Sequence, residues 1–330
     1  MKKFLMLFTV IVAGIFVLAA CSNDADVNDT TADNGVEIAT PDIELDVDVT
    51  DTDPLNVLVT FSIIADMVEN VGGHLVNVTT IVPIGEEPEE YEFTPGDVMN
   101  AIAADVIFHN GLDLEHEYDW FEELMATADR IEDVDFFAVN DESNAVRLLT
   151  EDLQDYYDPH TWMDPILGME MVNTIADVLA GFMPEYADVF AANAQNFNAK
   201  IYAVYTEWAG RFDQFSDMSL VTTEGAFRYF GYRFNITTEF IWEFNSEDEG
   251  TPEQFIRVID IVNAGNVPFL FIESSVDPDY MEQVSEETGV PIFDEYLFTD
   301  SLSEVGGPAA TYLAFLRHNL QTVYTAFAAE

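Results

Sequence analysis

Cysteine and basic residues are scarce in this chain. Of its 330 residues one is cysteine, and only 10 are Lys or Arg against 63 Asp or Glu, which gives a formal net charge of −53. A single cysteine excludes a disulfide within the chain, so an ordinary hydrophobic core must hold the fold. The negative charge excludes nucleic acid as a partner, because phosphates would be repelled. The acidity is interpreted first as a solvated surface suited to a salty medium, and second as a means of gathering cations near a binding cleft.

Several sequence signatures of catalysis and nucleotide binding are also absent. The chain has no glycine-rich phosphate loop, no Gly-x-Ser-x-Gly turn, no cysteine spacing typical of zinc sites and no His-Glu-x-x-His motif. It contains only five histidines. The chemistry must therefore be sought in residues that are scattered along the chain and brought together by folding.

The N-terminus has the order basic, apolar, small, cysteine. Lys2 and Lys3 precede an apolar run that ends in Leu18-Ala19-Ala20-Cys21. This order predicts a bacterial lipoprotein signal over residues 1–20, with lipid on Cys21 and the protein held on the extracytoplasmic face of the membrane. A transmembrane anchor is disfavoured because a span needs about 20 apolar residues and the apolar run here, residues 4–18, is shorter. The polar residues 21–53 contain no aromatic side chain and predict an acidic, disordered tether.

Beyond the tether, strand-like and helix-like segments alternate. This alternation predicts the α/β class, with parallel sheets covered by helices on both faces. We expect two such lobes, over residues 54–183 and 216–330. The expected strands cover residues 56–61, 76–82, 105–109, 135–139, 219–223, 237–242, 268–272 and 291–293, and the helices between them include 120–128, 278–288 and 309–328.

Local signals mark several helix ends. Thr94-Pro95 and Thr251-Pro252 are typical of capped helix starts, and Ser62 is a further candidate cap. Gly72-Gly73 predicts the end of the helix that begins near Ser62. Residues 184–215 have no internal proline and keep helical spacing of apolar residues, so they predict a single connecting helix about 45 Å long between the lobes.

Polar residues that follow predicted strands are the candidates for ligand binding, since ligands of parallel sheets bind at the carboxyl ends of strands. His160 lies between two prolines and two aspartates in residues 158–165. Glu224 follows a strand and precedes Gly225, which we expect to let a ligand approach. Asp300 lies late in the second lobe. Residues 86–92 are dense in glutamate and, by composition alone, indicate a solvated charge run.

Eight segments resemble, in order, the metal-binding lipoproteins of manganese and zinc ABC importers, the group that includes the streptococcal manganese-binding surface antigens. They are residues 60–67, 82–85, 110–115, 158–162, 223–227, 241–243, 249–254 and 271–277. The resemblance runs from about Asn56 to the C-terminus. It implies two α/β lobes joined by one long helix, with a single divalent ion bound in the cleft between them by two histidines, a glutamate and an aspartate.

The resemblance implies that His160, Glu224 and Asp300 are metal ligands. At the position of the family's first histidine this chain has Glu89, within Glu87-Pro88-Glu89-Glu90-Tyr91. In one interpretation Glu89 replaces the imidazole with a carboxylate and the site still binds metal. In the other, a ligand has been lost and binding is weak. The intact remainder of the motifs favours the first. His109 and His116 do not occupy family ligand positions, and His109 is expected to be a packed structural residue.

The resemblance further implies a solute-binding lipoprotein, not an enzyme, that captures a transition metal and delivers it to the permease of an ABC importer. An oxygen-rich ligand set favours manganese over zinc, and trivalent iron would balance three carboxylates. We expect a monomer. The alternatives are a surface adhesin, for which the lipid anchor suffices, and a metal-dependent hydrolase, which would need an open coordination position for water.

Overall fold

The computed structural model describes residues 43, 52–115, 119–149, 156–244 and 250–329. The predicted signal peptide, the lipidation site Cys21 and almost all of the predicted tether lie outside these residues, as does His116.

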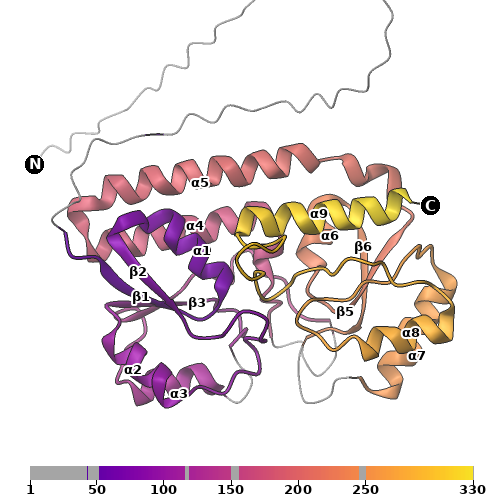
Figure 1. Ribbon diagram of the computed structural model, residues 1–330, viewed down its shortest axis with the longest axis horizontal. Coiled ribbons are helices and arrows are strands. Elements are labelled where there is room, and N and C mark those ends of the chain that lie inside the picture. Colours follow the sequence, from indigo (N-terminus) through magenta and orange to yellow (C-terminus); the bar gives the residue numbers. More distant parts are fainter. Residues whose placement is uncertain (1–42, 44–51, 116–118, 150–155, 245–249, 330) are drawn as a thin grey trace, which may run out of the picture. The chain divides into compact units, whose positions relative to one another are not determined.

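The N-terminal lobe is built on a four-stranded parallel sheet in the order β2-β1-β3-β4. The strands are β1 (Leu55–Val59), β2 (Val76–Thr80), β3 (Val106–His109) and β4 (Phe136–Ala138). Helix α1 (Ser62–Gly72) lies on one side of this sheet, and α2 (Pro95–Ala103) and α3 (Trp120–Thr127) lie on the other (Figure 1). Covering both faces buries Val57, Leu58 and Val59 together. The predicted α/β class is confirmed.

The C-terminal lobe has two paired parallel strands, β5 (Ser219–Glu224) and β6 (Thr237–Trp242). Around them lie α6 (Arg228–Phe234), α7 (Pro252–Ala264), α8 (Asp279–Thr288) and α9 (Tyr312–Ala328). The predicted strands 268–272 and 291–293 are wrong as strands, because they form only isolated bridges, in which Leu270 pairs with Val221 and Ile292. Pro268 and Pro291 have no N–H to donate, so neither can extend a ladder of hydrogen bonds.

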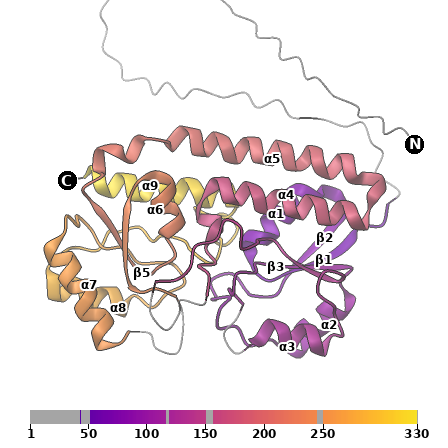
Figure 2. The same ribbon diagram turned by 180° about the vertical axis from the view of Figure 1, so that it is seen from behind.

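The connecting helix α5 (Ala187–Trp208) runs alongside both lobes (Figures 1 and 2). Its 22 residues give a length of about 33 Å, so the predicted helix over 184–215 was too long. Short 3₁₀ turns replace the outer parts, at Pro184–Tyr186 and Arg211–Phe215. Gly210 adopts a positive φ of 76°, which ends the α-helical path.

Most of the predicted helix ends agree with the structure. Thr94 and Thr251 each form a capping box, and Gly73, with a φ of 55°, ends α1. The prediction that Ser62 caps α1 was wrong, because Phe61 is the N-cap residue and makes no side-chain cap. The Ser62 hydroxyl instead accepts a hydrogen bond from the backbone N–H of Leu302 at 2.8 Å. It therefore links the first lobe to a loop of the second.

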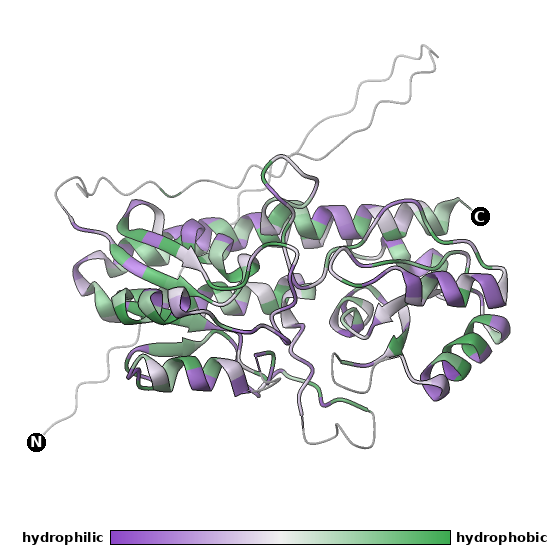
Figure 3. Ribbon diagram, turned by 60° about the horizontal axis from the view of Figure 1, so that its bottom comes forward, coloured by the Kyte–Doolittle hydropathy of each residue, from purple (hydrophilic) through white to green (hydrophobic). Residues whose placement is uncertain are grey.

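Helix α4 (Pro165–Phe182) is long and apolar enough to cross a membrane by length and composition alone. It begins at the N-cap Asp164 and packs against α1 and α5, with Met171, Val172 and Ile175 in the core. Figure 3 shows hydrophobic and hydrophilic residues alternating along the helices, as expected where one face is buried. These contacts identify α4 as a core helix of the folded part.

Gly168 on α4 allows a close approach to Tyr312, whose hydroxyl donates to the backbone oxygen of Trp162 at 2.7 Å. A methyl group at this position would overlap the Tyr312 hydroxyl. We predict that Gly168→Ala lowers the free energy of unfolding by about 1–3 kcal/mol, measured by urea denaturation. Gly181→Ala on the same helix meets no atom within 4 Å and is the matched control, expected to be neutral or stabilising by up to about 1 kcal/mol. Equal effects of the two substitutions would contradict this account.

Asp66 on α1 accepts a hydrogen bond from the N–H of Tyr312 at 3.1 Å, at the start of α9. Burial raises the pKa of Asp66 from 3.8 to about 6, against the opposing effect of the Tyr312 N–H. The folded state therefore holds a proton that the unfolded state releases, and stability falls as pH rises from about 4 to about 6.

We predict that Asp66→Asn removes this contribution to the pH dependence of stability. The free energy of unfolding of the variant, relative to the unmodified protein, should rise by up to about 3 kcal/mol between pH 4 and pH 7. The measurement is urea denaturation across that pH range. Parallel pH profiles for the two proteins would show that Asp66 does not titrate in this way.

Candidate metal site

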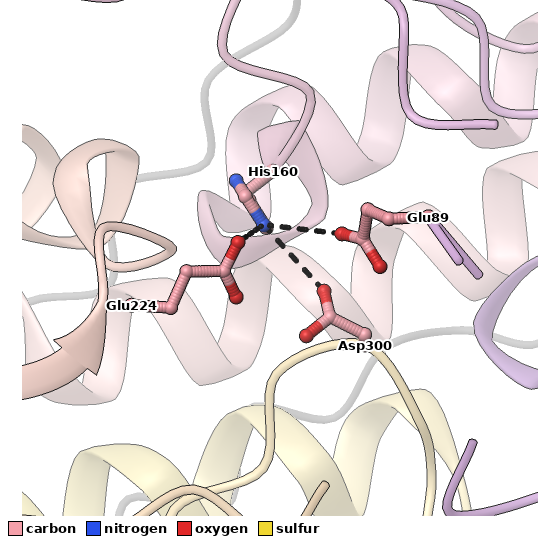
Figure 4. A group of neighbouring side chains, drawn as sticks. All are labelled: Glu89, His160, Glu224 and Asp300. Atoms are coloured by element: carbon pink, nitrogen blue, oxygen red, sulfur yellow. Dashed lines mark ion pairs between the residues drawn. The ribbon is translucent and has the colours of Figure 1, made fainter. Parts of the chain in front are cut away.

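Four side chains from both lobes point toward one another in Figure 4. Glu89 lies in the loop between β2 and α2, and His160 immediately precedes the 3₁₀ turn Thr161–Met163. Glu224 is the last residue of β5, and Asp300 lies in the loop that leads to α9. The structure thus brings together the three residues that the resemblance implied as ligands and Glu89, which stands at the position of the family's fourth.

The geometry of this group suits a single ion. One potential ligand atom from each residue lies within 4.8 Å of the others, and all four residues are buried. The His160 Nε2 atom is 3.5 Å from an oxygen of Glu224, 3.5 Å from one of Asp300 and 3.9 Å from one of Glu89. Among the described residues, none of these carboxylate oxygens nor His160 Nε2 has a hydrogen-bond partner. Buried polar atoms of this kind are normally satisfied, so their convergence indicates a cation site.

Two loops that carry acidic ligands are tied to each other and to the scaffold. The Gly85 N–H donates to Ser301 Oγ at 2.9 Å, which joins the Glu89 loop to the Asp300 loop. Beside Glu89, the Pro88 carbonyl accepts a hydrogen bond from Trp120 Nε1 at 2.9 Å. These bonds fix loops that would otherwise separate under the repulsion of their carboxylates.

The indole of Trp162 supports the Asp300 loop through a hydrogen bond. Its Nε1 donates to the Thr299 carbonyl at 2.9 Å, and its ring packs against Phe61 and the His160 ring. Because Trp162 follows His160 by two residues, the same short segment positions one ligand directly and another through a hydrogen bond.

Glu224 is held through the backbone at the end of β5. The Glu273 carboxylate accepts the N–H groups of Thr223 and Glu224 at 2.8 and 2.9 Å. At Gly225 the structure shows a close approach of another part of the chain. A methyl group on Gly225 would lie 2.5 Å from the Glu243 carbonyl oxygen, so only glycine allows the backbone at Glu243, just after β6, to lie this close.

Burial and, after it, mutual repulsion disfavour negative charge on the carboxylates of the site. Burial, followed by the charges of Asp300, Glu87 and Glu224, raises the pKa of Glu89 well above its ordinary value. Burial and then the Glu224 charge raise the pKa of Asp300 to about 7. Burial lowers the pKa of His160, but Glu224 and the hydrogen bond with Asp158 outweigh it and the pKa ends well above its ordinary value. A bound cation would relieve this repulsion by replacing protons.

Sequence reasoning missed two acidic residues near the site. Glu87 was assigned to a solvated run, yet its Oε1 atom is buried and its charge acts on Glu89. Glu273 lies in residues 271–277, a segment that carries the family resemblance without marking this residue, and burial raises its pKa to about 8. No periodic signal marks either residue, because both enter the site through loop geometry. His109 stacks on Phe121 with ring centroids 4.5 Å apart, in agreement with its predicted packing role.

Comparison with known proteins agrees with this geometry. The family described as "Zinc-uptake complex component A periplasmic" matches residues 57–326. The chain belongs to this family.

Its relatives are named as metal-transport lipoproteins. The manganese ABC transporter substrate-binding lipoprotein PsaA of Streptococcus pneumoniae is 35% identical over 279 residues, which cover 84% of this chain and 90% of that protein. The iron ABC transporter substrate-binding lipoprotein MtsA of Streptococcus pyogenes is 36% identical over 275 residues, covering 82% and 88%.

Solved structures of two periplasmic metal-binding proteins share the fold. A Mn-bound periplasmic metal-binding protein from Candidatus Liberibacter asiaticus is 27% identical, with a TM-score of 0.71, covering 83% of this chain and 99% of that one. The periplasmic zinc-binding protein TroA of Treponema pallidum has a TM-score of 0.74 at 24% identity, and the match covers 83% of this chain and 99% of that one. At this identity the likeness supports the fold alone. The two-lobed α/β architecture predicted from the sequence is therefore that of the family.

Proposed function

We propose that this protein captures one transition-metal ion outside the cytoplasmic membrane and delivers it to the permease of an ABC importer. Glu89, His160, Glu224 and Asp300 are the proposed ligands. The observation that carries the proposal is their convergence, from both lobes, as four buried side chains without hydrogen-bond partners at the converging atoms among the described residues. The names of the relatives support the transport role.

Manganese is the metal that the ligand chemistry favours. Three carboxylates and one imidazole form an oxygen-rich set, whereas zinc sites favour nitrogen and sulfur. The interpretation in which Glu89 replaces a histidine is supported by its position, since its carboxylate occupies the same buried group as the other three side chains. Iron remains the second candidate, because a trivalent ion would balance three carboxylates.

The remaining parts of the proposal rest on the sequence. They are a lipid anchor at Cys21 after a signal peptide over 1–20, a tether over 21–53, lobes over 54–183 and 216–330, and a monomer that has no enzymatic activity and no nucleic-acid partner. With a ligand set drawn from both lobes, release of the ion requires that the bridge between the lobes be broken. The permease would do this by drawing the lobes slightly apart, since α5 spans both and resists a wide hinge motion.

Asp300→Asn tests the ligand assignment. It removes one negative oxygen at nearly constant volume, so we predict that affinity for Mn²⁺ falls by about 100-fold or more in calorimetric titration. The metal-free variant should melt at the same or a higher temperature, because repulsion within the site is reduced. Glu304→Gln, on the same loop but exposed, is the matched control and should bind as the unmodified protein does. Undiminished affinity of the Asp300 variant would refute the assignment.

Glu89→His tests the choice of metal. It supplies the nitrogen ligand that zinc prefers, so the ratio of zinc to manganese affinity should rise by about 10-fold or more. Competition between the two ions, followed by metal analysis of the protein, gives this ratio. Glu90→His places a histidine on the adjacent exposed residue and should leave the ratio unchanged. If both variants behave alike, Glu89 does not contact the ion.

A further inference from the structure

A buried arginine outside the proposed ligand set connects the site to the surface. The Arg228 side chain, on α6 of the C-terminal lobe, is 5% exposed. Its Nη1 atom is 3.0 Å from Glu243 Oε1 and 3.5 Å from Asp158 Oδ2. Its Nη2 atom donates to the backbone carbonyl of Arg147 at 3.1 Å. One guanidinium thus contacts two carboxylates and a backbone oxygen, which come from both lobes.

Asp158 passes this contact on to the proposed metal ligand. Its Oδ1 atom is 2.9 Å from His160 Nδ1 and accepts the His160 backbone N–H at 3.1 Å. The hydrogen bond at Nδ1 turns the ring so that Nε2 faces the three ligand carboxylates. Arg228 pairs at 3.5 Å with Oδ2, the other carboxylate oxygen of Asp158, so its charge helps to hold the carboxylate that orients the ring.

The same cluster holds a strap of the N-terminal lobe, which we define as residues 146–149. Glu243 Oε1 accepts the Leu149 N–H at 2.6 Å, and Tyr229 Oη accepts the Val146 N–H at 3.0 Å. The Tyr229 hydroxyl also donates to the Asp158 carbonyl at 2.8 Å. Leu149 is 68% exposed, so the strap reaches the protein surface.

We propose that Arg228 is a positioning residue that couples the metal-binding histidine to the strap over residues 146–149. The inference rests on the proposed function, because it requires that His160 bind the ion. A metal that fixes the imidazole also fixes Asp158, and through Arg228 and Glu243 it fixes the strap. Binding of the metal at the buried site thereby restricts the motion of an exposed segment, through a series of side-chain contacts.

A second arginine on the same helix provides a matched control. Arg233 pairs with Asp164, with Nε 2.7 and 2.8 Å from the two carboxylate oxygens. This ion pair also joins α6 to the N-terminus of α4, but it contacts neither Asp158 nor the strap. Its loss should cost stability without affecting the orientation of His160.

The experiment compares Arg228→Gln, Arg228→Lys and Arg233→Gln in two measurements. The first is Mn²⁺ affinity by calorimetric titration, where Arg228→Gln should lose about 10- to 100-fold, as substitutions of residues that orient metal ligands do. Arg228→Lys keeps a cation within reach of Asp158 and should recover most of the affinity. Arg233→Gln should bind within about threefold of the unmodified protein.

The second measurement is hydrogen exchange of the Val146 and Leu149 amides with and without Mn²⁺. In the unmodified protein and in Arg233→Gln, Mn²⁺ should slow the exchange of both amides. In Arg228→Gln the effect on Leu149, which is bound through Glu243, should disappear, whereas Val146 should keep protection because Tyr229 links it to Asp158 without Arg228. If Arg228→Gln does not fold, Glu243→Gln tests the same series of contacts. We then expect a smaller loss of Mn²⁺ affinity and weaker metal-dependent protection of the Leu149 amide.

Unchanged Mn²⁺ affinity in Arg228→Gln, or metal-dependent protection of the Leu149 amide that survives the substitution, would overturn the inference. Failure of the proposed function is distinct from this result. In that case the unmodified protein itself would not bind Mn²⁺, whereas failure of the inference alone leaves binding that depends on Asp300 but not on Arg228.

Discussion

The mutual repulsion of three buried carboxylates is the constraint on which the arrangement of this protein depends. Glu89, Glu224 and Asp300 converge on the Nε2 atom of His160, and within the described part of the chain that imidazole is the only basic group within 4 Å of them. Burial makes each charge costly, and proximity makes the charges costlier together. Such an arrangement persists only if the scaffold holds the carboxylates in place and either protons or a cation compensate for their charges.

The scaffold opposes this repulsion with neutral hydrogen bonds between segments that are far apart in the sequence. Ser62 and Ser301 each accept a backbone N–H from the other lobe, and Trp162 supports the Asp300 loop. None of these contacts introduces a charge into the site. The cationic Arg228 does not contact the proposed ligands. It pairs with Asp158, which lies behind His160, and with Glu243, and so leaves the ligand carboxylates uncompensated. Because neutral hydrogen bonds hold the loops and the arginine lies outside the ligand set, the site retains its affinity for a cation and the protein can still fold.

The sequence predicted the parts of the structure that depend on local chemistry. The capping boxes at Thr94 and Thr251, the end of α1 at Gly73 and most strand positions follow from residue type and spacing. The parts it missed depend on long-range contacts. Ser62 carries the local signature of a cap but bonds a loop 240 residues away, and Gly225 makes room for the backbone of Glu243. The set of site residues was reached through family resemblance, because no spacing along the chain brings Glu89 and Asp300 together.

Anomalous X-ray diffraction at the manganese edge, from crystals of the Mn²⁺-loaded protein, tests the central claim most directly. The account predicts a single strong peak at about 2.0–2.3 Å from the His160 Nε2 atom and from oxygens of Glu89, Glu224 and Asp300. A peak elsewhere in the molecule, or a bound ion that Glu89 does not contact, would contradict it.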